Sequence, residues 1–150
     1  MAFIENKKAR LNYELLETFE AGAELLGFEV KAVRSGMGSL EGARVVIRGG
    51  EAFLLGATIS PYQVENTPAS YTADRTRRLL LNKKELVTLA EHEGQKGLTI
   101  VPIKWYNRGR KIKLEVAVAR HKKKYDKREA LKERDSKRQI QLHLKNQSHD

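Results

Sequence analysis

The chain has 150 residues, contains no cysteine and carries a formal net charge of +10 at pH 7. The absence of cysteine excludes disulfides, thiol nucleophiles and thiolate metal sites. No apolar run approaches the roughly 18 residues of a membrane span, and the N-terminus lacks the apolar core of a secretory signal. The composition therefore predicts a cytoplasmic protein whose basic charge favours nucleic acid, and no membrane, as its partner.

The first forty residues give mixed signals. Leu11, Tyr13 and Leu15 alternate with polar residues, which predicts a half-buried strand. Residues 25–34 fit a helix face and a strand face equally. The glycine cluster at 36–42 misses the spacing of a dinucleotide-binding loop by one residue, so we interpret it as turns.

The middle of the chain begins with a predicted hairpin. Two apolar, β-branched runs, Ala43–Arg48 and Ala52–Ile59, flank Gly49-Gly50, and both glycines can adopt the positive φ of a tight hairpin turn. A polar connection over residues 62–74 follows the second run.

A short helix is predicted after this connection. Asn82 and Glu85 have the spacing of a capping box, in which each side chain accepts a hydrogen bond from the backbone of the other residue. Gly94 is the expected end of the helix. Three apolar side chains are expected to face inward: Leu86, Leu89 and Ala90.

The segments 98–106 and 111–119 form a second predicted hairpin around residues 107–110. Apolar and charged residues alternate in its second strand, which predicts an antiparallel sheet with one face in solvent. Pro102 lacks an N–H, so its strand is at a sheet edge or carries a bulge. Two hairpins and one short helix predict a mostly β fold, namely a small antiparallel OB-fold-like β-barrel with short helices over residues 1–119.

Residues 120–150 form a basic C-terminal tail. They hold eleven Lys or Arg against five Asp or Glu, which is +6 of the total +10. The tail lacks the broad apolar stripe of a core-facing helix, and its oppositely charged pairs each stabilise a helix by only ~0.2–0.5 kcal/mol. We therefore expect it to be disordered when free and helical against a polyanion. The alternative is a solvated tail that only aids solubility.

No pattern in the chain predicts catalysis. The four histidines show no metal-ligand spacing, and neither a hydrolase elbow nor a phosphate-binding loop is present. We therefore expect no catalytic residue, no metal and no cofactor. Basic clusters at residues 7–10, 75–78 and 108–111, with Tyr106 and Tyr125 as stacking partners, predict RNA binding instead. On this reasoning alone, a generic RNA-binding barrel, such as a ribosomal protein or an initiation-factor-like module, and an RNA-processing nuclease stay open as alternatives.

Several short motifs occur in an order that resembles one known family. The motifs are Asn6-Lys-Lys-Ala9, Phe19-Glu-Ala-Gly22, Glu29-Val-Lys31, Gly50-Glu-Ala-Phe53, Arg75-Thr-Arg-Arg-Leu-Leu-Leu-Asn-Lys-Lys-Glu85 and Lys122-Lys-Lys-Tyr-Asp-Lys-Arg128. Together they resemble the small protein B family, the SsrA-binding proteins of bacterial trans-translation, over nearly the whole chain.

The resemblance implies a monomeric, non-enzymatic adaptor that binds the tRNA-like domain of transfer-messenger RNA. That RNA, charged with alanine and carried by elongation factor Tu, is delivered to stalled ribosomes. The implied RNA-binding residues are Asn6, Lys7, Lys8, Glu20, Arg75, Arg77 and Leu80. The tail is implied to occupy the empty mRNA channel near the decoding centre through Lys122, Lys123, Lys124, Tyr125, Asp126, Lys127 and Arg128.

Two places depart from the family pattern. Tyr71-Thr72-Ala73 stands where an Asp-Pro pair is usual, and His121 stands where glycine is common. The first departure leaves the geometry of the loop before the arginine-rich run open. The second is expected to stiffen the connection between barrel and tail, because histidine is less free than glycine.

Overall fold

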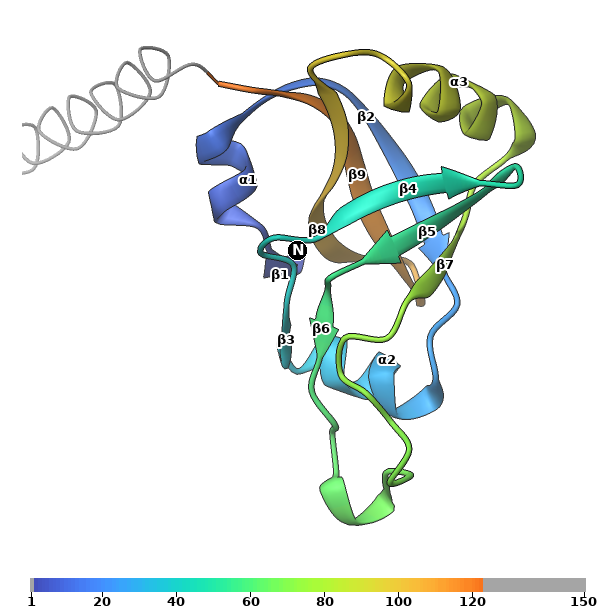
Figure 1. Ribbon diagram of the computed structural model, residues 1–150. Helices are drawn as coiled ribbons and strands as arrows, with labels where there is room; N and C mark the ends of the chain where they lie inside the picture. Colours follow the sequence, from blue (N-terminus) through green and yellow to red (C-terminus); the bar gives the residue numbers. More distant parts are fainter. Residues whose placement is uncertain (1, 123–150) are drawn as a thin grey trace, which may run out of the picture.

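The computed structural model describes residues 2–122; Met1 and residues 123–150, which include most of the predicted tail, lie outside the described residues (Figure 1). Within these residues the chain forms nine strands, three short α-helices and one 3-10 turn. The strands are β1 (Ala2–Glu5), β2 (Tyr13–Ala23), β3 (Gly38–Ser39), β4 (Arg44–Arg48), β5 (Glu51–Leu55), β6 (Thr58–Ile59), β7 (Arg77–Leu80), β8 (Leu98–Arg108) and β9 (Lys111–His121). The helices are α1 (Lys7–Asn12), α2 (Gly27–Arg34), the 3-10 turn η1 (Val64–Asn66) and α3 (Lys83–Glu93).

The architecture is a curled antiparallel sheet with short helices packed around it (Figure 1). Seven strands pair in the order β1-β8-β9-β2-β7-β5-β4, and β3 pairs with β6 separately. This confirms the predicted mostly β, OB-like class. Within residues 2–122 the outer strands β1 and β4 do not pair with each other, so hydrogen bonds do not close the sheet into a complete ring.

Both predicted hairpins are confirmed. Gly49 and Gly50, with φ of 58° and 76°, form the two-residue turn between β4 and β5. In the second hairpin Arg108 pairs with Lys111, and Gly109 has a φ of 63°. The β8 register shifts just after Pro102, and β8 lies between β1 and β9. Of the two alternatives for this proline, the bulge is therefore correct.

The second hairpin is covered on both faces at one end. Its inward residues, such as Trp105 and Leu114, join the main core. On the other face Ala9 of α1 packs in a second buried cluster with Ala117 and Ala119, which are both 0% exposed. The prediction of one solvent face is therefore wrong at this end. The sequence signal for this second buried face is that Ala117 and Ala119 continue the row of charged residues Lys111, Lys113 and Glu115.

The first predicted strand is wrong at its beginning, because residues 7–12 form α1. The Asn6 side chain starts this helix by accepting a hydrogen bond from Ala9 N at 3.1 Å. Leu11 therefore lies in the helix, while Tyr13 and Leu15 lie in β2 as predicted. The ambiguous segment 25–34 is mostly helical, with α2 over Gly27–Arg34.

The predicted helix after residue 82 is confirmed. Asn82 Oδ1 accepts a hydrogen bond from Glu85 N at 2.8 Å, and Glu85 Oε1 accepts one from Asn82 N at 3.2 Å. Leu89 is buried and Gly94 caps the end, but Ala90 is exposed, contrary to prediction. None of the helices in residues 2–122 is long and apolar enough to cross a membrane.

Candidate nucleic-acid interface

Leu80 is an apolar side chain on the outer surface of the sheet. Residues of β7 alternate between its two faces, so Leu79 is 2% exposed in the core while Leu80 is 47% exposed. Gly22 of β2 lies opposite Leu80, and a Cβ added to Gly22 would come within 3.3 Å of Leu80 Cβ. The missing side chain at Gly22 therefore leaves Leu80 uncovered.

A groove of about 330 Å³ runs beside Leu80 and Gly22. Its apolar part includes Leu25 of the β2–α2 connection and Ile112 of β9. Four cationic side chains from α2 and from the β8–β9 hairpin also line it: Arg34, Arg110, Lys111 and Lys113. An apolar floor bordered by cations suits a base or sugar whose neighbouring phosphates lie on Lys and Arg.

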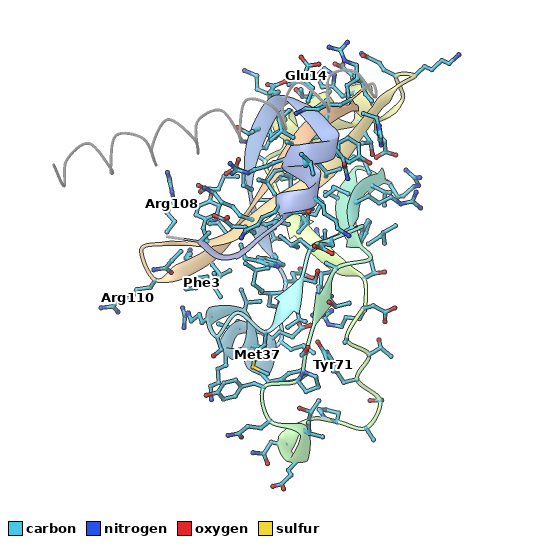
Figure 2. The ribbon with its side chains drawn as sticks, turned by 90° about the vertical axis from the view of Figure 1, so that its left-hand side faces the viewer. Phe3, Glu14, Met37, Tyr71, Arg108 and Arg110 are labelled. Carbon is cyan, nitrogen blue, oxygen red and sulfur yellow. The ribbon has the colours of Figure 1, made fainter. Side chains whose placement is uncertain are left out.

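The tip of the β8–β9 hairpin forms one wall of this groove. Arg108 and Arg110 project from the tip (Figure 2). Arg34 Nη2 of α2 donates a hydrogen bond to the backbone carbonyl of Arg110 at 2.9 Å. Arg34 thereby links α2 to the hairpin and fixes the position of the basic wall relative to Leu80.

Glu20 lies on β2 among groups that offset its charge. Its carboxylate accepts a hydrogen bond from the Tyr106 hydroxyl and forms an ion pair with Arg108, whose Nε lies 3.1 Å from Glu20 Oε2. Burial and the bond to Glu20 raise the pKa of Tyr106, so this hydroxyl stays a donor. Lys104 Nζ lies 5.6 Å from the centre of the Tyr106 ring. The carboxylate is therefore held in place with acceptor capacity left, and its repulsion of phosphate is reduced.

Glu20 and Leu80 belong to one surface. Glu20 and Gly22 are two residues apart on β2, so they face the same side of the sheet. Gly22 pairs with Leu80, and a Cβ at Gly22 would lie 3.7 Å from Lys113 Nζ of β9. The structure thus brings two predicted RNA-binding residues beside the basic cluster at 108–111. The contributions of Gly22, Arg34 and Lys113 to this surface were missed from the sequence.

Glu29 of α2 forms the centre of a buried ionic network. It is 0% exposed, and Arg77 Nη2, also 0% exposed, donates to its Oε2 at 2.7 Å. Arg75 and the backbone N–H of Leu26 donate to Oε1. Burial alone would raise the pKa of Glu29, but these donors outweigh it and lower the pKa from 4.5 to about 2. Glu29 is therefore ionised at neutral pH.

Arg75 and Arg77 were expected to hold the RNA backbone, but both side chains bind groups within the protein. The Arg77 guanidinium is buried and donates to the carbonyls of Ala57, Arg75 and Ala73 as well as to Glu29. It is therefore not accessible to phosphate in this structure. The Arg75 side chain is 27% exposed and is mostly committed to Glu29. The two arginines tie the loop over residues 60–76 to Glu29 of α2.

The departure at residues 71–73 is part of the same network. The Tyr71 hydroxyl lies 2.9 Å from Glu29 Oε2, and its ring packs edge-on against Phe28 with centroids 4.7 Å apart. The Ala73 carbonyl accepts hydrogen bonds from Ile59 N and from Arg77. In this chain the tyrosine therefore anchors the loop, where a proline would restrict it through its ring.

Comparison with known proteins agrees with these features. The family model described as "SmpB protein" matches residues 3–146. The chain belongs to the SmpB family. It is 45% identical over 141 residues to the SsrA-binding protein of Microcystis aeruginosa, covering 94% of this chain and 92% of that protein. The SsrA-binding protein of Chlorobaculum tepidum is 48% identical over 139 residues, covering 92% and 88% respectively.

The fold is also similar to a solved SmpB-family structure. A chain described under "tmRNA-SmpB: a journey to the center of the bacterial ribosome" superposes with a TM-score of 0.69 at 39% identity. The similarity covers 87% of this chain and 95% of the other. This similarity in fold agrees with the family assignment from the sequence.

The remaining predicted residues of this SmpB-family chain lie around α1. Lys7 and Lys8 are exposed on the helix, and Lys8 Nζ lies 3.6 Å from Glu41. Asn6 is 3% exposed, and its Nδ2 donates to the carbonyls of Leu40 and Pro102 at 3.1 and 2.9 Å. With Oδ1 capping α1, the Asn6 amide is used within the protein. A direct RNA contact from Asn6 does not fit this placement.

α1 and the Leu80 groove lie at opposite ends of β2. α1 packs near Tyr13, whereas Gly22 is nine residues further along, which is about 30 Å of extended strand. The structure therefore does not bring Lys7 and Lys8 together with Leu80.

The tail begins at the α1 end of the sheet. β9 continues through His121, two residues beyond the boundary expected at 119/120. The His121 ring packs against Tyr13 at 5.1 Å, and Lys122 N donates to the Asn12 carbonyl at 2.8 Å. The predicted ribosome-binding residues Lys123, Lys124, Tyr125, Asp126, Lys127 and Arg128 lie outside the described residues.

Proposed function

We propose that this protein binds the tRNA-like domain of transfer-messenger RNA and brings it to stalled ribosomes for trans-translation. It acts in the cytoplasm as a monomeric adaptor and not as an enzyme, and it meets elongation factor Tu through the charged RNA. The observation that carries the proposal is the exposed Leu80 groove with its basic wall, in a chain 45% identical to an SsrA-binding protein over nearly its whole length.

In this proposal the RNA contacts the groove through Leu80, with Glu20 accepting hydrogen bonds from base N–H or 2′-hydroxyl groups. The hairpin cations hold the neighbouring phosphates, with Arg75 and the α1 residues Lys7 and Lys8 as outlying contacts. From the interior, Asn6 supports α1 by capping it, and Arg77 supports the loop over residues 60–76 through Glu29. Contacts between Lys or Arg side chains and RNA phosphates weaken as salt is added. The affinity for RNA is therefore expected to fall as ionic strength rises.

Leu80→Asp tests the groove. The change removes an apolar contact and places a carboxylate beside phosphates, so we expect at least about tenfold weaker binding, or ~1.4 kcal/mol. Gel retardation of the isolated tRNA-like domain measures it, and circular dichroism should stay native because Leu80 is 47% exposed. Val87→Asp on α3, at a residue 52% exposed, is the matched control and should bind within about twofold of wild type. Equal binding by both variants would contradict the assignment.

The tail is proposed to act on the ribosome and not on the tRNA-like domain. The triple variant Tyr125→Ala, Lys127→Ala, Arg128→Ala should retain binding of that domain but lose peptide tagging on stalled ribosomes. A chain ending at Lys122 should also bind the domain and fail to support tagging, because it keeps β9 complete but lacks the rest of the tail. Normal tagging by either protein would remove the tail from the mechanism.

The adaptor proposal also predicts that RNA leaves the protein unchanged. Structured RNA incubated with the full chain and Mg²⁺ should stay intact while being retarded in a gel. Cleavage above background, lost on substitution of a carboxylate, would favour a nuclease instead.

A further inference from the structure

A second hollow lies between α1, the β3–β4 connection and β8. Its volume is about 590 Å³, and its lining shares no residue with the Leu80 groove. Sites for small ligands have volumes of roughly 300–1,000 Å³. We refer to this hollow as the α1 cleft. Its lining combines apolar and aromatic residues, an amide and charged groups, which can together hold the base, sugar and phosphate of a nucleotide.

The floor of the α1 cleft is apolar and aromatic. Ala9 and Val101, 4% and 3% exposed, lie at its base, and the Tyr13 ring forms part of its wall. The His121 ring packs against Tyr13 at an interplanar angle of 72°, which fixes the orientation of the tyrosine. A fixed aromatic ring beside an apolar floor can stack on a base of any identity.

An amide in the wall has unused hydrogen-bonding capacity. Asn12 Oδ1 is buried and has no hydrogen-bond partner among the described residues. Buried polar atoms of proteins are almost always hydrogen-bonded. An asparagine amide carries both donors and acceptors, so after a small rotation it can pair with the edge of a base.

The rim of the α1 cleft is charged. Arg44, the first residue of β4, is exposed there and makes no salt bridge within residues 2–122. Lys8 Nζ and Glu41 Oε2 face each other at 3.6 Å on the same rim. Arg44 and Lys8 can hold a phosphate, while the Glu41 carboxylate can accept a hydrogen bond from a ribose hydroxyl.

We propose that the α1 cleft binds one unpaired ribonucleotide, with its base on Tyr13 and its phosphate on Arg44. The proposal rests on the RNA-binding function argued above, and it adds a second contact at the other end of β2 from Leu80. It also gives Lys8 a role that the Leu80 groove does not provide.

Fluorescein-labelled pentaribonucleotides of A, C and U, titrated by anisotropy with the full chain at low salt, test the proposal. Arg44→Glu and Asn12→Leu are each expected to weaken binding of at least one pentamer by about tenfold or more. Lys96→Glu, at an exposed lysine outside the cleft, is the charge-matched control and should change it by less than about twofold. Asn12→Leu should fold normally, because it removes a buried atom that has no partner.

The proposal is overturned if each pentamer binds Arg44→Glu, Asn12→Leu and Lys96→Glu with equal affinity. It is also overturned if wild type binds none of the pentamers. Gel retardation of the tRNA-like domain by wild type separates this failure from that of the proposed function. If the domain is bound while the pentamers are insensitive to Arg44 and Asn12, only the nucleotide site fails. If the domain is not bound, the RNA-binding function itself fails.

Discussion

Glu29→Gln is expected to destabilise the protein by about 3 kcal/mol at pH 7. The structure lowers the pKa of Glu29 from 4.5 to about 2. A difference of about 2.5 pH units at ~1.36 kcal/mol per unit corresponds to about 3 kcal/mol in favour of the folded state. A loss of this size agrees with the ~3–5 kcal/mol cost of removing one partner from a buried ion pair. Arg77, buried and paired with Glu29, would keep its charge without a counterion.

The same linkage predicts the pH dependence. Because the folded-state pKa is the lower one, the stabilisation is complete above pH 4.5 and is lost as the pH falls towards 2. Guanidinium unfolding followed by the fluorescence of the buried Trp105 should give a difference of about 3 kcal/mol between wild type and Glu29→Gln at pH 7, and about half of that at pH 3. Glu65→Gln, an exposed residue of the same loop, is the control and should change stability by under about 0.5 kcal/mol. A variant within about 1 kcal/mol of wild type at both pH values would refute the buried-network argument.

Two further substitutions test the α1 cap and the space beside Leu80. Asn6→Ala removes the α1 cap and leaves the Leu40 and Pro102 carbonyls unpaired. It should lower the free energy of unfolding in guanidinium by about 3 kcal/mol. A decrease below about 1 kcal/mol would show that these hydrogen bonds contribute little to stability. Gly22→Leu should fill the space beside Leu80 and weaken binding of the tRNA-like domain about tenfold. Gly27→Leu, at a residue with open space around it, is the control and should leave the affinity unchanged. Equal affinities of the two variants would argue against the groove as the binding surface.

The features predicted correctly from the sequence depend on short stretches of chain. Gly49-Gly50 sets the first hairpin, because two consecutive residues with positive φ favour a tight turn. The capping box of Asn82 and Glu85 likewise lies within four residues. α1 was missed because its stability depends on distant groups. Its six residues form a helix only with Asn6 tied to Leu40 and Pro102, residues 34 and 96 positions away.

The candidate site follows the same division. The exposure of Leu80 follows from strand alternation around it, and the basic cluster at 108–111 is visible in the sequence. The sequence does not show that Leu80 lies close to this cluster, because α2, β7 and the β8–β9 hairpin meet only in the folded chain. Arg77 shows the converse difficulty. In the sequence it is one of several arginines, and only the burial of Glu29, 48 positions away, distinguishes it from an RNA contact.

β9 separates the Leu80 groove from the start of the tail. Its eleven residues run from Lys111, at the wall of the Leu80 groove, to His121, where the tail begins. At about 3.3 Å per residue the strand spans roughly 30 Å, which is almost four times the Debye length of about 8 Å at physiological ionic strength. An RNA held at the hairpin tip and a polyanion bound from Lys122 onward therefore need not compete for the same cations. A rigid, doubly hydrogen-bonded strand between β2 and β8 also keeps this separation constant, so the proposed adaptor can contact two RNA surfaces at a fixed distance.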